Sequence, residues 1–200
     1  MRIKKSALIL LFSITKFTAL YSSIGTQNYY ALHPAAADKD YVAKIQDSLF
    51  FGIVSDDLKV TERALYLHGH PDQLFQKALE YNSQHRGCPE KRFVGTHMTP
   101  FLLACQLGRA YHVQLMVRQK GAELVNKTDE YGNTPLMYAA QGLNDNFELN
   151  LTTIKFLLGK KADIRRKNNL GANVFSYAQW LSSSDEITRF MELLPQEDKN

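Results

Sequence analysis

The sequence predicts an all-α solenoid of about four helix-turn-helix units joined by short hairpin-like turns. Three observations lead to this prediction: residues 129–140 combine a tight turn with a short helix, a second helical pattern follows, and the same unit recurs on either side. Recurrence of one unit is typical of a stacked core, in which each unit buries its apolar face against the next.

The unit beginning at Asp129 shows how the residues favour this structure. Asp129 can accept hydrogen bonds from the amides that follow it, and Gly132 stands where the turn needs a positive φ. Thr134 is expected to cap the first helix, and Pro135 to occupy its first position, where no amide hydrogen is needed. Apolar residues at helical spacing predict the second helix, namely Leu151, Ile154, Leu157 and Leu158.

Three further units can be found by comparison with this one. Upstream, Thr99-Pro100 repeats the opening of the first helix, and Gly108 falls in the loop between the two helices. Downstream, Asn173-Val174 stand in place of Thr-Pro, and residues 49–69 indicate a degenerate first unit. Atypical units at both ends are expected, because terminal repeats must cap the core. The four units are predicted near residues 47–72, 96–128, 129–167 and 168–194.

These motifs resemble the ankyrin-repeat family over residues 41–194, most closely over 95–164. The resemblance implies one domain that is not an enzyme, needs no cofactor and binds a protein partner, whose identity the sequence does not indicate. A monomer is expected. The histidine that usually follows Thr-Pro-Leu is Leu102 in one copy and Met137 in the next, so a hydrogen bond between adjacent turns is expected to be missing.

Two segments depart from a plain stack of repeats. Residues 73–95 are an insertion between the first and second units, and the loop 142–150 is several residues longer than usual. Leu74, Ala78 and Leu79 favour one or two helical turns in the insertion. Both segments are places where this chain could acquire a function of its own, because loops often carry binding residues.

The resemblance also implies where a partner would bind. In such stacks, residues beside the turn glycine and at the end of the first helix form a continuous concave strip. Tyr131 is the best anchor, because an exposed ring combines apolar area with a hydroxyl; the alternative is that it packs only on the adjacent turn. The strip comprises Gln106, Glu130, Tyr131, Asn133, Gln141, Asn169, Leu170 and Gln179, with Arg166 at its rim.

The N-terminus predicts export. Arg2, Lys4 and Lys5 precede an apolar run over residues 7–15 that is too short to span a bilayer, a pattern typical of a secretory signal. We expect a signal peptide over 1–25, a linker over 26–40, no stable membrane span after cleavage, a short tail over 195–200 and a periplasmic or secreted protein. The alternatives are a buried or membrane-associated N-terminal helix, and delivery into a host cell by a bacterium.

The charge balance gives no support for nucleic-acid binding. The chain has 24 Lys and Arg against 20 Asp and Glu, and four of the basic residues lie before Thr26, which leaves 20 against 20 in the mature chain. Without a net basic footprint, no nucleic-acid partner is expected. A local basic run remains at Lys160-Lys161 and residues 165–167. It is either a solvated edge or a contact for an acidic patch on a partner.

Candidate residues for chemistry are few. His68 and His70 with Asp72 could hold a metal, but a four-coordinate site needs further ligands, so a simple exit turn is favoured and no metal is expected. A metal-binding or enzymatic accessory protein that uses the His68/His70 turn remains the alternative function. Cys88 and Cys105 could form a disulfide in an oxidising compartment, although two unpaired thiols are favoured because Cys105 faces the stack.

Overall fold

A computed structural model describes residues 39–67, 69–75, 79–85, 88–95, 97–181 and 183–194. The predicted signal peptide and most of the predicted linker therefore lie outside the described residues. Residues 42–200 form one compact unit, distinct from residues 1–41. Within the described part, no helix has the length and apolar content that a membrane span would need.

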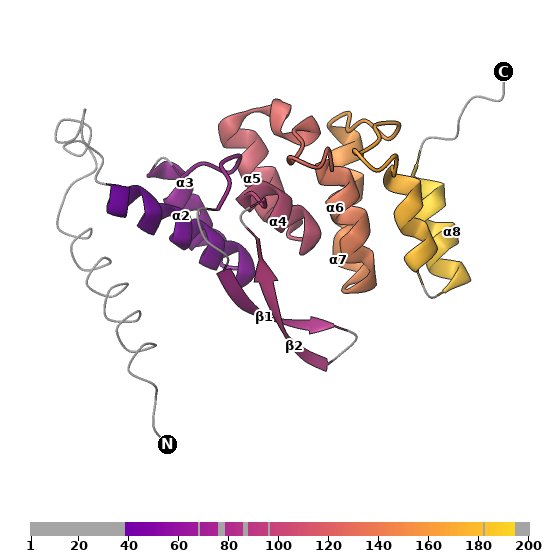
Figure 1. The fold of residues 1–200 in the computed structure, drawn as a ribbon, viewed down its shortest axis with the longest axis horizontal. Coiled ribbons are helices and arrows are strands. Elements are labelled where there is room, and N and C mark those ends of the chain that lie inside the picture. Colours follow the sequence, from indigo (N-terminus) through magenta and orange to yellow (C-terminus); the bar gives the residue numbers. More distant parts are fainter. Residues whose placement is uncertain are drawn as a thin grey trace. The chain divides into compact units, whose positions relative to one another are not determined.

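The predicted helical repeat solenoid is confirmed. Helix pairs follow one another along the chain (Figure 1), in the order α2 (Lys39–Val54), α3 (Leu58–Tyr66), α4 (Pro100–Gln106), α5 (Ala110–Lys120), α6 (Pro135–Gln141), α7 (Phe147–Gly159), η3 (Val174–Trp180) and α8 (Ser184–Leu193). Short 3-10 turns, η1 (Ala122–Asn126) and η2 (Gly142–Asn144), lie in the connections. The first helices pack in one row, with α4 on α6 and α6 on η3, and the second helices pack in another, with α3 on α5, α5 on α7 and α7 on α8.

The local signals for the best repeat act as predicted. Gly132 has a φ of +79°, which a residue with a Cβ adopts only with strain. The Thr134 side chain accepts a hydrogen bond from the Met137 amide and caps α6, and Pro135 occupies the first helical position. In the last repeat, Asn173 takes part of this role, because its side chain accepts a hydrogen bond from the Phe175 amide at 3.1 Å. The element that follows is a 3-10 helix.

The core runs between the two rows of helices. The small residues expected on the first helices are fully buried, as are apolar residues of the second helices. Removing such side chains from water is the main force that holds the repeats together. The residues with no exposed surface include Leu103, Ala104, Cys105, Val113, Met116, Ala139, Ala140, Ile154, Leu157 and Phe190.

The prediction of helical turns in the insertion is wrong. Residues 79–85 and 88–94 form an antiparallel hairpin of two strands instead, β1 (Leu79–His85) and β2 (Cys88–Val94). Alternate residues share one face of a strand, and Tyr81 and Val94 on that face are buried. The Tyr81 ring packs edge-on against Phe50 of α2, with 6.4 Å between ring centroids. The hairpin is therefore anchored to the first repeat.

Candidate functional site

Asp129 organises the turn that precedes α6. Its carboxylate accepts hydrogen bonds from the amides of Tyr131 at 3.0 Å and Asn133 at 2.7 Å, and from the Tyr138 hydroxyl at 2.8 Å. Burial raises the pKa of Tyr138, and the hydrogen bond to Asp129 adds to that effect. The hydroxyl therefore stays protonated and remains a donor, which fixes the tyrosine ring beside the turn.

Asparagine side chains link this turn to the next one. The Asn169 amide donates to the carbonyl of Tyr131 at 2.9 Å, and its side chain donates to the carbonyl of Glu130 at 3.1 Å. Asn168 donates from its side chain to that of Asn133 at 2.7 Å. Two members of the predicted strip, Asn133 and Asn169, thus have their side chains engaged in joining repeats.

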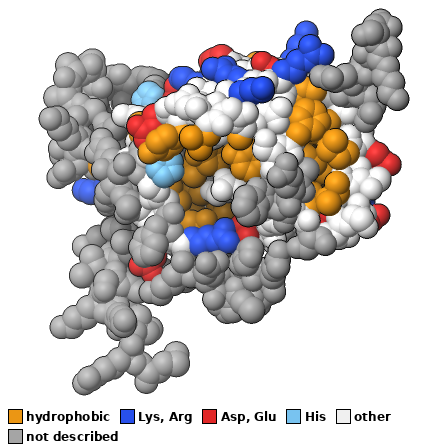
Figure 2. Space-filling model, turned by 45° about the vertical axis from the view of Figure 1, so that its right-hand side comes forward, with side chains coloured by type: hydrophobic (Ala, Val, Ile, Leu, Met, Phe, Trp, Pro, Cys, Tyr) orange, Lys and Arg blue, Asp and Glu red, His pale blue; other side chains and the backbone are white. Residues whose placement is uncertain are grey.

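Four residues of the predicted strip, Gln106, Tyr131, Asn133 and Gln141, line one groove of about 420 Å³. Aromatic and amide side chains dominate the lining, and the face seen in Figure 2 carries hydrophobic areas across its middle. The groove is formed by the insertion, the turn at residue 131 and the first helices of the repeats. Its remaining lining residues are Tyr81, Arg92, Gly95, His97, Met98, Tyr138 and Tyr177.

Tyr131 is one of these lining residues and is 52% exposed. Its ring meets that of His97 edge-on, with 5.6 Å between centroids. The ring thus packs on a neighbour, and about half of its surface is still exposed; its role as the anchor for a partner stays a prediction. Beside it, the Gln106 side chain donates to that of Gln141 over 3.5 Å, which is a long hydrogen bond.

The insertion is tied to the third repeat by an ion pair. The Arg92 guanidinium of β2 makes two hydrogen bonds to the Asp145 carboxylate, of which Nη2 to Oδ1 measures 3.0 Å. The side chains are 24% and 21% exposed, so the pair is partly shielded from water. Asp145 belongs to the long loop 142–150. The two segments predicted to depart from a plain stack thus contact each other.

The other described residues of the predicted strip do not line this groove. Glu130 borders the second hollow described below. Leu170 is 92% exposed. Arg166 is exposed and donates to the carbonyl of Asn126 at 3.2 Å. The Gln179 side chain lies outside the described residues, so its place in the strip stays a prediction.

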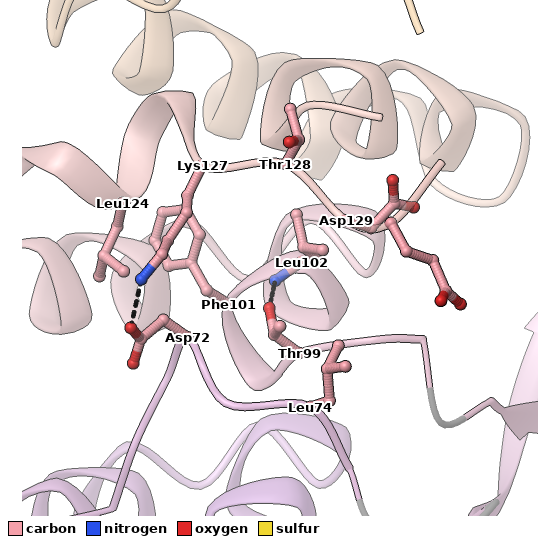
Figure 3. A pocket seen from close by; sticks show the side chains of 10 residues that line it. Asp72, Leu74, Thr99, Phe101, Leu102, Leu124, Lys127, Thr128 and Asp129 are labelled. Carbon is pink, nitrogen blue, oxygen red and sulfur yellow. Dashed lines mark hydrogen bonds and ion pairs between the residues drawn. The ribbon is translucent and has the colours of Figure 1, made fainter. Parts of the chain in front are cut away.

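The second hollow holds about 160 Å³ and lies where the insertion begins (Figure 3). Asp72, at its edge, forms an ion pair with Lys127 over 2.5 Å, and this hydrogen bond lowers the pKa of the Asp72 carboxyl. Thr99 caps α4 beside it by accepting from the Leu102 amide, as Figure 3 shows. The charged pair links two repeats and is already satisfied, which gives this hollow a structural role.

The candidate metal turn is only partly described. His68 lies outside the described residues, and His70 is exposed, with its backbone hydrogen-bonded to the Gln46 side chain. In the described part of the chain, no three His, Cys, Asp or Glu side chains form a cluster that could hold a metal. Cys105 is a buried free thiol, and burial raises its pKa, so it stays protonated. The Cys88 side chain lies outside the described residues.

The basic run is exposed at the turn end of the stack. All five residues, Lys160, Lys161, Arg165, Arg166 and Lys167, are exposed. Figure 2 shows Lys and Arg side chains along the upper edge, the end at which Figure 1 places the turns after α5 and α7. This edge is separate from the groove lining.

Comparisons with known proteins agree with this architecture. A family model described as ankyrin repeats, in three copies, matches residues 63–168. Among solved structures, the chain is similar to one in "Bd0816 Predatory Endopeptidase from Bdellovibrio bacteriovorus in complex with immunity protein Bd3460", with a TM-score of 0.51 and 21% identity. The match covers 72% of this chain and 62% of that one, and it shows the fold alone. No curated protein matches the sequence.

Proposed function

The chain belongs to the ankyrin-repeat family, and on that premise we propose that it is a non-enzymatic module that binds a protein partner in the groove around Tyr131. Ankyrin repeats are protein–protein interaction modules. The observation that carries the proposal is the half-exposed Tyr131 ring, set among further tyrosines and the Gln106 and Gln141 amides. Tyrosine is enriched at binding hot spots, because it combines large apolar area with a polar tip.

The geometry supports a rigid surface rather than a reactive site. Asp129 accepts hydrogen bonds from two backbone amides and from Tyr138, so its acceptor positions are occupied. The Cys105 thiol is buried and protonated, which removes it as a nucleophile. A preorganised surface of this kind binds without a large cost in ordering side chains.

We further propose that the protein acts outside the cytoplasm as a monomer. The basis is the basic and apolar pattern of residues 1–25, together with the balanced charge of the remaining chain. Delivery into a host cell differs from this only in the destination. Fractionation of the source cell together with its host separates the two, because a delivered protein would be recovered from host cytosol.

Crosslinking in the source cell, followed by affinity purification, tests the binding proposal. A partner captured by the parent should be lost with Tyr131→Ala combined with Gln141→Ala. The matched control is Lys155→Ala, which alters an exposed side chain on the second helix α7, outside the groove lining. Circular dichroism checks that all three proteins fold. Equal capture by the groove variant and the parent would place the binding surface elsewhere.

The metal or enzymatic alternative has its own test. Metal analysis of the purified full-length protein, with and without His70→Ala, should find no bound metal in either. Stoichiometric metal that disappears with His70→Ala would favour the alternative, because it would assign a ligand role to the His68/His70 turn.

A further inference from the structure

The insertion hairpin forms one wall of the groove, and Asp145 of the long loop 142–150, which is not a lining residue, holds that wall through Arg92. The hairpin contributes Tyr81 and Arg92, which face each other in the strand register. A plain stack of repeats would present the strip around Tyr131 as an open surface. Here four residues of that strip, Gln106, Tyr131, Asn133 and Gln141, line a groove that the hairpin borders on one side.

The charge of this groove points to an uncharged ligand. Arg92 is the one Lys, Arg, Asp or Glu among the described residues that line it, and its guanidinium is paired with Asp145. A charged ligand would lose its hydration on binding and would gain no opposite charge in return, because the single full charge of the groove is already neutralised. The lining otherwise consists of tyrosine rings, a methionine, a histidine and side-chain amides.

The polar groups of the groove suit an extended peptide. Gln106 and Gln141 share a long hydrogen bond of 3.5 Å, so both amides can turn to a better partner. Each amide offers donors and an acceptor, the same set as a peptide group. An extended segment brings unpaired backbone N–H and C=O groups, whereas a helix has already used its own.

We propose that the hairpin wall, held by the Arg92–Asp145 pair, makes this groove a site for an extended, uncharged segment of a partner polypeptide. This inference rests on the proposed function and adds the shape and charge of the ligand. The ion pair acts as a positioning contact. It holds the hairpin against the third repeat, and its two charges neutralise each other instead of pairing with the ligand.

The experiment uses the full-length protein and a phage-displayed library of random linear peptides. Synthetic copies of the selected peptides are then measured by fluorescence anisotropy. Tyr131→Ala should weaken binding by at least about tenfold, the size of a hot-spot loss. Arg92→Gln and Asp145→Asn should each weaken it several-fold, and the exchange of charges in Arg92→Asp with Asp145→Arg should restore it. Lys155→Gln is the control and should bind as the parent does.

The outcomes separate this inference from the function it rests on. Peptide binding that is weakened by Tyr131→Ala but not by Arg92→Gln or Asp145→Asn would overturn the role of the hairpin wall. The groove would remain the binding surface. Unchanged binding of the peptides by all these variants, together with unchanged capture of the crosslinked partner, would overturn both this inference and the proposed function. Selection of helical or strongly charged peptides would overturn the assigned ligand class. The test includes Arg92→Gln, Asp145→Asn and the charge exchange as three separate variants, so misfolding of one of them does not decide the result.

Discussion

Gly142 is a residue at which two neighbouring repeats come very close. Its backbone is ordinary helix with a φ of −69°, so no left-handed geometry requires glycine there. A Cβ at this position would lie 1.9 Å from the carbonyl oxygen of Gln106 in the preceding repeat. Because a backbone atom cannot move aside cheaply, Gly142→Ala should lower the free energy of unfolding by about 1–3 kcal/mol. Urea denaturation measures this loss.

Gly159 provides the matched control for that prediction. It is the last residue of α7, and a Cβ there would meet no atom within 4 Å. Gly159→Ala should leave the free energy of unfolding unchanged or raise it by up to about 1 kcal/mol, because alanine favours the helix. Equal unfolding midpoints for the two variants would contradict the close approach at Gly142.

His112 gives the fold a dependence on pH. Its side chain on α5 is buried, and Nδ1 lies 3.5 Å from the Asp56 carboxylate in the turn after α2. Burial is the largest effect and lowers the pKa of His112; the Asp56 charge opposes it and the Arg109 charge adds to it. The folded protein therefore binds fewer protons than the unfolded chain once the pH falls below the usual histidine pKa of about 6.5.

The sign of the His112 effect follows from that difference. Stability is complete above about pH 6.5 and declines as the pH falls from there toward the lowered pKa of the folded protein. Denaturant unfolding at a series of pH values should show this decline, and His112→Leu should flatten it whatever its effect on stability at neutral pH. An unchanged slope in the variant would assign the proton uptake to another group.

The residue-scale features that the sequence predicted are local ones. The positive φ of Gly132 and the cap by Thr134 depend on residues within a few positions, so turn and capping rules were enough. The hydrogen bonds between adjacent turns could not be predicted in this way. Asn168 and Asn169 make that link to a turn more than 30 residues earlier, which only the stacking of repeats brings near.

At the scale of elements, α7 tests the register of the second helices. Leu157 has no exposed surface, whereas its neighbour Leu158 is only half-buried. Leu157→Ala should lower the free energy of unfolding by about 2–5 kcal/mol, because it leaves a cavity between repeats. Leu158→Ala is the control and should cost clearly less in the same denaturation experiment. A larger loss for Leu158 would mean that the helix is rotated from the orientation described.

The hairpin shows why the element type of the insertion was missed. The spacing of Leu74, Ala78 and Leu79 satisfies a helical period, but a period over so few residues does not separate helix from strand. Arg86-Gly87, between two seven-residue strands, is the signal that favoured a hairpin, since glycine is common in two-residue loops. Without the hairpin, Tyr81, Arg92 and His97 could not be placed in the groove.

At the scale of the whole molecule, the groove combines what the repeat pattern predicts with what it does not. Gln106, Tyr131, Asn133 and Gln141 were predicted, because the same positions of each repeat lie side by side in a stack. The opposite side depends on the Arg92–Asp145 contact, which joins residues 53 positions apart. No periodicity encodes such a contact, since it arises between two segments outside the repeat.

The N-terminal segment sets where this molecule can meet a partner, so its processing is the prediction that concerns the whole chain. Residues 1–25 hold a basic flank and an apolar run that predict a signal peptide, and on that prediction the mature protein should begin near Thr26. Intact-mass and N-terminal sequence analysis of protein from the source cell should find that start. Leu10→Arg is the matched variant, because a charge in the apolar run should block export and leave the N-terminus uncleaved. Parent protein that keeps Met1 and is found in the same cell fraction as the Leu10→Arg variant would contradict export. Its partner would then be sought in the cytoplasm.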